Sequence, residues 1–228
     1  MSHLINIFLE PAKVFDALRE KPTFLAPMLV VVLVGMASVL AYFLQVDPAW
    51  FEQHQLAQVR ATNPEMSEAE LRQMQQFMPG ARMSMVIMMV MSVLGPVLIW
   101  VLLAVYYLLA GKVAGHEVGF RRGISLGAWS AMPMALASLM AFVGTFVSSP
   151  QTGLEQLQYL NADQLFGVAL DSPWLTFARS FSFVFLWVWL LAALGWKTWF
   201  RTGWGQALLV VLLPWILYFG VVALIAAL

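Results

Sequence analysis

Cysteine is absent from the 228 residues of this sequence, which excludes disulfide bonds, cysteine zinc sites and thiol nucleophiles. Charge is also scarce, because only 11% of the residues are Asp, Glu, Lys or Arg, compared with about 25% in an average soluble domain. The 12 basic and 12 acidic residues balance, so the chain lacks the positive excess with which proteins bind nucleic acid. Nucleic acid is therefore excluded as a partner.

Hydrophobic residues make up 61% of the chain, well above the roughly 45–50% of soluble proteins. They gather in long apolar runs, each close to or above the roughly 20 residues with which a helix crosses the hydrocarbon core. The five predicted membrane spans are residues 24–44, 83–110, 124–147, 174–195 and 206–228. Helices are expected because lipid offers exposed backbone no hydrogen-bond partner. The predicted fold class is an all-α, polytopic membrane protein, with residues 1–228 forming one membrane domain.

Positive charges lie in three short segments that precede or connect these spans. They are Lys13, Arg19 and Lys21 before the first span, Lys112, Arg121 and Arg122 between the second and third, and Lys197 and Arg201 between the fourth and fifth. The loop between the first two spans carries both signs, and the loop between the third and fourth carries no cation. The positive-inside rule therefore predicts a cytoplasmic N-terminus and an extracytoplasmic C-terminus.

The segment 1–22 is predicted to form an amphipathic helix in the cytoplasmic interface of the membrane, bent at Pro11. Its apolar residues share one face and are Leu4, Ile7, Phe8, Val14, Phe15 and Leu18. The cations Lys13, Arg19 and Lys21 lie elsewhere and would contact anionic lipid headgroups. A cleaved signal peptide is the alternative interpretation. It is disfavoured because the leading region is too long and the apolar run that follows fills a whole span.

The loop between the second and third spans crowds together Lys112, His116, Glu117, Arg121 and Arg122. The cations suit a connector that sets topology, and they are also candidate contacts for lipids or a protein partner. His116 beside Glu117 could serve acid–base or metal chemistry, but no second histidine or carboxylate lies at helical spacing to complete a metal site. A solvated pair is favoured, and no metal or cofactor is predicted.

Arg179 is nearly the only ionisable residue within the predicted spans, which makes it a functional candidate. It lies about one turn from the outer end of the fourth span, close enough for its side chain to reach the interface. Alternatively, it faces an inner cavity and contacts a lipid headgroup or a carboxylate such as Asp171. The spans contain no Asp, Glu, Lys or His, which argues against proton relays and intramembrane proteases. We therefore expect the protein not to be an enzyme.

Prolines occur inside three of the spans, at Pro96, Pro133 and Pro214. Each removes a backbone donor and favours a kink, which could open a cavity for transport. In the third span small residues recur every four positions, at Gly127, Ala131 and Ala135. This spacing lets a neighbouring helix approach closely, either within the chain or in a homo-oligomer.

The loop between the first and second spans contains the signals of a short helix. Ser67 followed by Glu70 matches a capping box, and Pro79 with Gly80 ends the segment. The apolar residues of this helix share one side and are Leu71, Met74, Phe77 and Met78. We expect the helix to lie on the outer leaflet or to pack against the bundle.

Proline, glycine and aromatic residues follow one another along the chain in a distinctive order. They are Phe8, Pro11, Phe15, Leu18, Pro22 and Pro27 in the N-terminal part, Gly115, Phe120 and Pro133 around the start of the third span, and Trp187 and Gly195 in the fourth. In this order and spacing the chain resembles the Yip1 domain family, in particular its bacterial members. The resemblance implies five spans, a cytoplasmic N-terminus, a place in the bacterial cytoplasmic (inner) membrane, and structural roles for these residues.

The leading functional hypothesis is a non-enzymatic integral membrane protein that organises the membrane or binds partner proteins and lipids. It would use residues 1–22 and the loop from Lys112 to Arg122. The alternative is the translocation of a lipid or small solute through a kinked five-helix bundle, with Arg179 near its outer mouth. Expected partners are membrane lipids, anionic ones included, a membrane or cytoplasmic protein, and a second copy of the chain.

Overall fold

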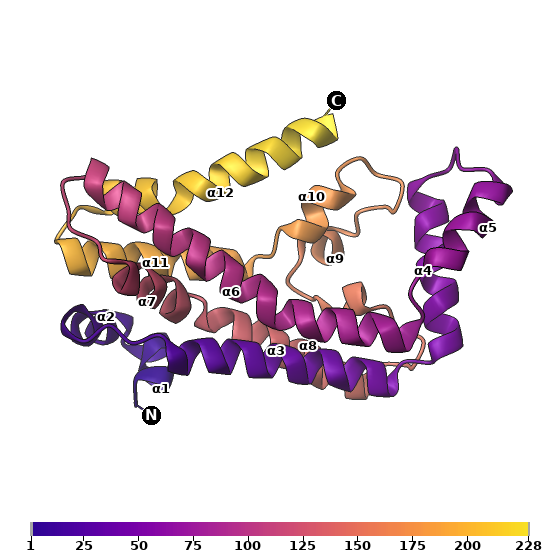
Figure 1. The fold of residues 1–228 in the computed structure, drawn as a ribbon, viewed down its shortest axis with the longest axis horizontal. Helices are drawn as coiled ribbons and strands as arrows, with labels where there is room; N and C mark the ends of the chain where they lie inside the picture. The colour runs from indigo at the N-terminus through magenta and orange to yellow at the C-terminus, as the bar shows by residue number, and fades with distance from the viewer. Residues whose placement is uncertain (1, 228) are drawn as a thin grey trace. The chain divides into compact units, whose positions relative to one another are not determined.

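The computed structural model describes residues 2–227, which form helices joined by turns and loops, with no β-strand among them. Figure 1 follows the helices in chain order. They are α1 (Ser2–Leu9), α2 (Pro11–Glu20), α3 (Leu25–Gln45), α4 (Pro48–Thr62), α5 (Glu68–Phe77), α6 (Ala81–Val113), α7 (Phe120–Ser130), α8 (Met132–Val147), the 3₁₀ helix η1 (Leu154–Leu157), α9 (Ala162–Phe166), α10 (Leu175–Ser180), α11 (Val184–Phe200) and α12 (Trp204–Ala227). The all-α prediction is confirmed.

Four stretches within residues 2–227 are long and apolar enough to cross a membrane. They are α3 with 21 residues, α6 with 33, the consecutive pair α7 and α8 over the 28 residues Phe120–Val147, and α12 with 24. Helix α11 is apolar as well but has only 17 residues. Membrane-spanning helices are thus present, and α11 is the element on which a fifth crossing depends.

The fourth predicted span, residues 174–195, begins too early. Residues Leu175–Ser180 form the separate helix α10, and α11 starts only at Val184. Between them the backbone at Phe181 is extended, and it pairs with the segment before α9 through the bonds Ala162 N–H to Phe181 O (2.9 Å) and Phe183 N–H to Leu160 O (2.8 Å). These backbone bonds end α10, and they place Arg179 outside α11.

The three prolines of the predicted spans have different effects on their helices. Pro96 and Pro214 lie inside the continuous helices α6 and α12. Pro133 is the second residue of α8, where a missing N–H costs no intrahelical bond. The third span is instead interrupted at Ala131, between the end of α7 and the start of α8.

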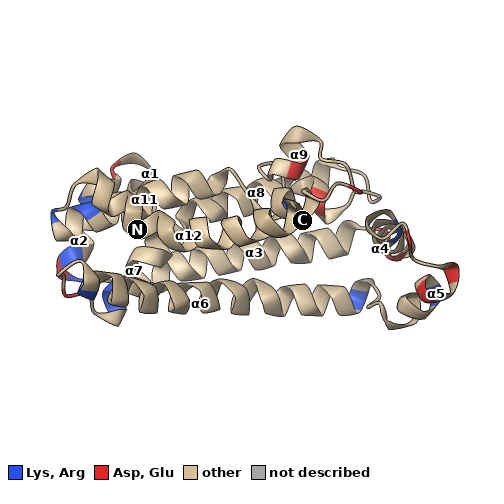
Figure 2. Ribbon diagram, turned by 90° about the horizontal axis from the view of Figure 1, so that it is seen from above, with Lys and Arg blue, Asp and Glu red and all other residues tan. Residues whose placement is uncertain are grey.

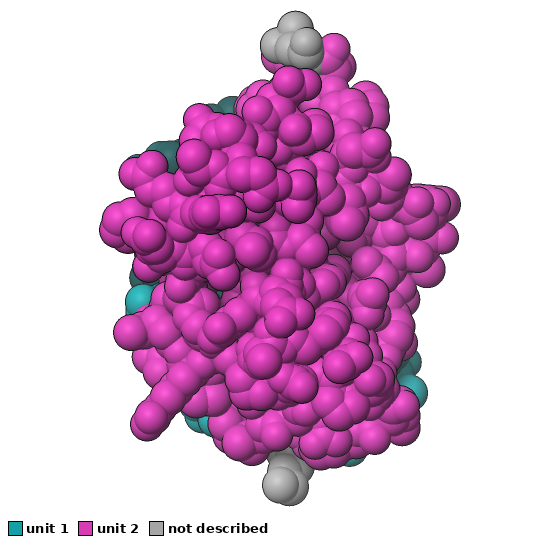
Figure 3. All heavy atoms as spheres, turned by 90° about the vertical axis from the view of Figure 1, so that its right-hand side faces the viewer, with its two compact units in different colours: residues 1–34, 92–136, 184–220 teal, residues 35–91, 137–183, 221–228 magenta. Residues whose placement is uncertain are grey.

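The chain divides into two compact units, which are described separately. Unit 1 comprises residues 1–34, 92–136 and 184–220, and unit 2 comprises residues 35–91, 137–183 and 221–228 (Figure 3). The helices α3, α6, α8 and α12 each contribute residues to both units. Each unit has its own hydrophobic core.

The core of unit 1 is built where α2 and α7 pack on α11. Phe15 of α2 and Trp196 of α11 are fully buried there, and Leu126 of α7 is almost so. Gly195 permits this packing, because a Cβ atom at that position would lie 2.5 Å from Leu126 Cδ1 and 2.8 Å from Phe15 Cε1. The absence of a side chain at residue 195 is therefore what lets three helices meet.

In place of the single interfacial helix predicted over residues 1–22, the structure has the two helices α1 (Ser2–Leu9) and α2 (Pro11–Glu20), which are separated at Glu10. Pro11 is the first residue of α2, a position that suits its fixed φ. The apolar side of α2, formed by Val14, Phe15 and Leu18, is buried in the core of unit 1. The protein's own α11, and not lipid, covers this side of the helix.

The small residues of α7 serve packing within the chain. A Cβ at Gly123 would lie 2.8 Å from the Ala104 Cα of α6, and a Cβ at Gly127 would lie 3.3 Å from the Trp100 ring. Ala131 and Ala135 are buried in the same core. The predicted close helix approach therefore occurs between α6 and α7.

Unit 2 contains the helices α4 and α5 and the segment from η1 to α10. Its core gathers Tyr42, Phe51 and Leu157, and the Tyr42 hydroxyl donates to the Thr152 carbonyl at 3.2 Å. The predicted short helix is α5. In its capping box the Ser67 hydroxyl accepts from the Glu70 N–H, and the Glu70 side chain accepts from the Ser67 N–H. The box satisfies two donors that a helix start would otherwise leave without partners.

Candidate lipid and partner interface

The two units differ in charge although the whole chain is neutral. Unit 1 carries eight Lys or Arg residues and four Asp or Glu residues, whereas unit 2 carries four and eight. The difference between these counts gives unit 1 four excess positive charges and unit 2 four excess negative charges. Figure 2 shows the Lys and Arg residues of unit 1 gathered where α2 and α7 lie. We call these cations the basic surface, and its members are Lys13, Arg19, Lys21, Lys112, Arg121, Arg122, Lys197 and Arg201.

Most cations of the basic surface remain without an acidic partner. Lys13 Nζ lies 2.6 Å from Glu10 Oε1, which locally offsets its charge. Lys197 lies over the Trp204 ring at 5.5 Å from its centre. Within residues 2–227 the structure shows no ion pair for the other members of this surface. Their charge is therefore available to anions in the surroundings.

The start of α7 is held against the link between α2 and α3 by backbone carbonyls of that link. Arg121 Nε donates to the Pro22 carbonyl at 3.0 Å. The Thr23 carbonyl accepts from Ser125 Oγ and from Trp129 Nε1, each at 2.7 Å. These bonds bring together Pro22 and Arg121, which lie far apart in the sequence. The contributions of Thr23 and Trp129 were not anticipated, since a carbonyl acceptor has no sequence signal.

A pocket of about 770 Å³ opens beside these bonds, between α1, the α2–α3 link and α7. Most of its wall is apolar and is formed by Leu4, Phe24, Leu25, Phe120, Ile124 and Trp129. Its polar lining residues are His3, Thr23 and Arg121. None of the described residues that line it is acidic. The lining of the pocket therefore combines an apolar wall with the cation Arg121, all within unit 1.

His116 and Glu117 do not form the predicted solvated pair. The His116 ring stacks on Phe200 with a centroid distance of 5.0 Å and also approaches the edge of Trp196 at 6.4 Å. Its backbone N–H donates to Gly111 O at 2.8 Å, and Gly115 adopts a positive φ of 74° in the same turn. This tight turn directs the ring toward α11, while Glu117 is exposed. Across residues 2–227 no cluster of three potential metal ligands is found.

Arg179, in unit 2, has a different partner from the one predicted. Its Nε lies 3.7 Å from Oδ2 of the buried Asp163, and its Nη1 donates to Gln58 Oε1 at 3.4 Å. Asp171, the predicted partner, is exposed. Asp163 was missed because it lies at the start of the five-residue helix α9, whose burial is a tertiary effect.

The environment of Arg179 continues into a small polar network on α4. Gln58 Nε2 donates to Glu155 Oε1 at 2.8 Å, and His54 Nε2 lies 2.7 Å from the same oxygen. Arg179 Nε and Asp163 Oδ1 are buried without a hydrogen-bond partner. The network ties α4 to the segment from η1 to α10 and leaves two polar atoms unsatisfied.

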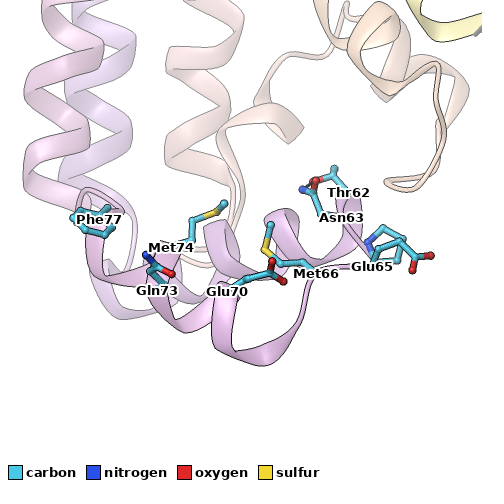
Figure 4. Close-up of a pocket in the computed structure, with 9 residues that line it drawn as sticks. Thr62, Asn63, Glu65, Met66, Glu70, Gln73, Met74 and Phe77 are labelled. Atoms are coloured by element: carbon cyan, nitrogen blue, oxygen red, sulfur yellow. Dashed lines mark hydrogen bonds between the residues drawn. The ribbon is translucent and has the colours of Figure 1, made fainter.

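A second hollow, of about 810 Å³, lies at the hairpin of α4 and α5 in unit 2. Figure 4 shows Glu70, Met74 and Phe77 around it. Glu70 accepts hydrogen bonds from the Ser67 hydroxyl (2.7 Å) and the Ser67 backbone N–H (2.8 Å), which hold the pKa of its carboxyl below the usual value. Phe77 is 80% exposed. Because the Glu70 carboxylate already serves the helix cap, it is not free to orient a ligand in this hollow.

Most of the residues in the predicted family pattern fall into three groups. Phe15, Pro27, Pro133 and Gly195 are buried in unit 1, and Pro11, Pro22 and Gly115 shape its turns and helix starts. Phe120 and Trp187 are about half exposed, at 44% and 43%. The Trp187 ring contacts Phe8 edge-on, with centroids 5.6 Å apart. The pattern is therefore mainly a packing pattern, with Phe120 at the edge of the pocket.

Long apolar helices with a basic surface define an integral membrane protein of the all-α class. The family model described as the Yip1 domain matches residues 5–225, which is nearly the whole chain. The chain belongs to the Yip1 domain family, as its sequence pattern predicted. Neither the curated proteins nor the solved structures contain a match to it.

Proposed function

We propose that this protein is a non-enzymatic, five-span membrane protein that organises the membrane by binding anionic lipids and partner proteins on its basic surface. The proposal rests on the unequal charge of the two units, since unit 1 has eight basic and four acidic residues. Cations within reach of an anionic leaflet each contribute about 1 kcal/mol to attraction. A surface of this kind recruits lipids and acidic protein segments without any chemical step.

The proposed orientation places the basic surface in the cytoplasm, with the N-terminus inside and the C-terminus outside. The positive-inside rule supports it, because short segments rich in Lys and Arg stay on the cytoplasmic side. The fifth crossing would be α11, whose 17 residues span about 25 Å at 1.5 Å per residue. That is slightly less than a hydrocarbon core of about 30 Å, and a short span is accommodated by local thinning of the bilayer.

The non-enzymatic part of the proposal is supported by the surroundings of the best catalytic candidates. The His116 ring is packed against Phe200 and Trp196, and its buried Nε2 has no hydrogen-bond partner among residues 2–227, so no acid or base is hydrogen-bonded to that nitrogen. Arg179 is engaged with Asp163 and Gln58. Both groups thus have structural neighbours that account for their position.

Photo-crosslinking from Phe120 tests the proposal, because this exposed residue adjoins Arg121 and the basic surface. A photoreactive residue there should capture anionic lipids or a defined protein, and the double variant Arg121→Ala with Arg122→Ala should reduce the capture at unchanged topology. Phe166 in unit 2, which is 71% exposed, serves as the control position. Equal capture of the same molecules from both positions would refute the role of the basic surface.

The alternative of lipid or small-solute translocation has one observation in its favour. Buried polar atoms without partners, Arg179 Nε and Asp163 Oδ1, are costly unless something else satisfies them. A polar solute or headgroup passing along unit 2 would do so. Reconstituted vesicles report this directly: flux of fluorescent lipids or solutes that falls in Arg179→Gln and Asp163→Asn supports translocation, and flux equal to that of protein-free vesicles rejects it.

A further inference from the structure

The pocket beside the α2–α3 link combines features that match an amphiphile. Its apolar wall includes Phe24 and Leu25, and Leu25 is the first residue of the membrane-spanning helix α3. Its cation is Arg121, at the start of α7. We propose that this pocket binds a single anionic phospholipid, with the phosphate on Arg121 and an acyl chain against the apolar wall. This inference rests on the proposed function, since it requires unit 1 to lie at an anionic leaflet.

Arg121 is positioned to bind a phosphate. Its Nε is engaged by the Pro22 carbonyl at 3.0 Å, which fixes the plane of the guanidinium group. No ion pair of Arg121 occurs within the described residues, and no acid lines the pocket, so the Nη1 and Nη2 groups are left for an anion. Arginine donates two parallel hydrogen bonds to a phosphate, and such charge-assisted bonds are about twice as strong as neutral ones.

Besides Arg121 and His3, a third polar residue lines the pocket, Thr23. The carbonyl of the same residue is occupied by Ser125 and Trp129. These two bonds fix the link on which Thr23 lies, so the wall of the pocket is formed before a ligand arrives. A preformed site loses less entropy on binding than a mobile one does.

The apolar wall distinguishes a lipid from a free phosphate. A soluble phosphate would contact Arg121 and leave Leu25, which is 65% exposed, and Phe120, which is 44% exposed, without any contact from the ligand. An acyl chain would cover these side chains, whereas a free phosphate has no apolar group with which to contact them. The volume of about 770 Å³ lies in the usual range of roughly 300–1,000 Å³ for small-molecule sites.

The first test measures binding of phosphatidylglycerol to the full chain in nanodiscs of phosphatidylcholine, by native mass spectrometry of the retained lipid. Arg121→Gln should weaken the tightest lipid site by roughly tenfold or more, as expected for the loss of charge-assisted hydrogen bonds. Arg122→Gln is the matched control, because Arg122 is an equally charged, exposed neighbour that does not line the pocket. Its effect should stay within about twofold. Melting curves verify that both variants fold.

The second test addresses the apolar half of the pocket. Leu25→Trp should fill the space of the acyl chain and reduce retention of phosphatidylglycerol, whereas Leu29→Trp should not. Leu29 is a suitable control because it lies one turn further along α3, is 56% exposed, and does not line the pocket. Glycerol phosphate, which lacks acyl chains, should fail to displace the bound lipid.

The outcomes separate this inference from the function on which it rests. If Arg121→Gln and Arg122→Gln weaken the binding of phosphatidylglycerol equally, the lipid is attracted by the basic surface as a whole. That result would overturn the proposed pocket site and leave the proposed function intact. Displacement by glycerol phosphate would show an anion site without lipid specificity and would also overturn the inference. No preference for phosphatidylglycerol over phosphatidylcholine in the native chain would overturn both.

Discussion

Gly195 is the residue whose replacement should disturb unit 1 most directly. In Gly195→Ala the new methyl group would lie 2.5 Å from Leu126 Cδ1 and within 3 Å of the Phe15 ring. Overpacking of this kind typically costs about 1–3 kcal/mol, so the thermal midpoint in detergent should fall.

Gly220→Ala is the matched control for this substitution. Gly220 also lies in an apolar helix of unit 1, and a Cβ there would have no atom within 4 Å. The thermal midpoint of Gly220→Ala should stay the same or rise slightly, because alanine favours helix over glycine by about 1 kcal/mol. If the two variants melt alike, the close approach of α2, α7 and α11 at Gly195 does not constrain stability.

Arg201 is the only non-glycine residue among residues 2–227 with a positive φ, at 53°, directly after the end of α11. A left-handed conformation costs a residue with a side chain about 1–2 kcal/mol, and glycine avoids this cost. Arg201→Gly should therefore be more stable than Arg201→Ala. Both variants lose the same charge, so their difference in unfolding midpoint reports the backbone alone. A less stable glycine variant would contradict the assigned conformation.

Single residues were predictable to the extent that their role follows from their own chemistry. Phe15 and Gly195 were expected to be structural, and their burial in unit 1 agrees with this. Thr23 could not be identified, because it contributes a backbone carbonyl that every residue type possesses. Asp163 could not be identified as the partner of Arg179 either, since only the folded chain brings α9 and α10 together.

At the scale of the element, the capping box of α5 should make this helix sensitive to pH. The hydrogen bonds from Ser67 lower the pKa of Glu70 in the folded state. The contribution of the box is therefore complete above the unfolded pKa, and it is lost as the pH falls through the lowered folded value. In Ser67→Ala this dependence should weaken, because only the backbone N–H of residue 67 still bonds the Glu70 carboxylate, and the first turn of α5 should exchange its amide hydrogens faster at neutral pH.

Hydrogen exchange followed by mass spectrometry, corrected for the intrinsic effect of pH, measures this change. Helix α4 is an internal control, because its own cap is Asp47, whose side chain accepts from Ala49 N and Trp50 N. Exchange in α4 should be the same in both proteins. Unchanged protection of α5 in Ser67→Ala would contradict the importance of the box.

Helices were predictable where hydrophobicity or capping signals define them, and less so where tertiary bonds end them. Helices α3 and α12 and the apolar part of α6 lie close to the predicted ranges, and α5 follows its capping box. The separation of α10 from α11 was missed, because it depends on backbone bonds between Phe181 and Ala162 and between Phe183 and Leu160. Hydropathy does not contain information about such pairing, since Phe181 and Phe183 fit an apolar helix equally well.

At the scale of the whole molecule, the proposed orientation predicts the location of the C-terminus. With α11 crossing the membrane, five crossings carry the chain from a cytoplasmic N-terminus to an extracytoplasmic C-terminus. Alkaline phosphatase fused after residue 228 should then be active, and green fluorescent protein fused at the same place should be dark. A fusion after Arg201, in the basic segment, is the control and should give the reverse. The reverse result at residue 228 would show four crossings, with α11 outside the bilayer.

The unequal charge of the two units was only partly visible in the sequence. The short basic segments predicted the cations of unit 1 one by one, since the positive-inside rule reads them locally. Packing between segments that are distant in the sequence joins three of them into one compact unit, residues 1–34, 92–136 and 184–220. The excess of four positive charges therefore became countable only once the structure had grouped these segments.

The contact between α2 and α11 has a consequence for the order of events on the ribosome. Trp199 Nε1 donates to the Phe15 carbonyl at 2.6 Å, although 184 positions separate the two residues. The nascent chain thus carries Val14, Phe15 and Leu18 long before the helix that buries them exists. Throughout most of translation the apolar side of α2 has to be covered by something else, and the nearest apolar phase is the bilayer into which α3 inserts. The amphipathic character of the first 22 residues, which α11 conceals in the finished protein, is thus exposed while the protein is being made.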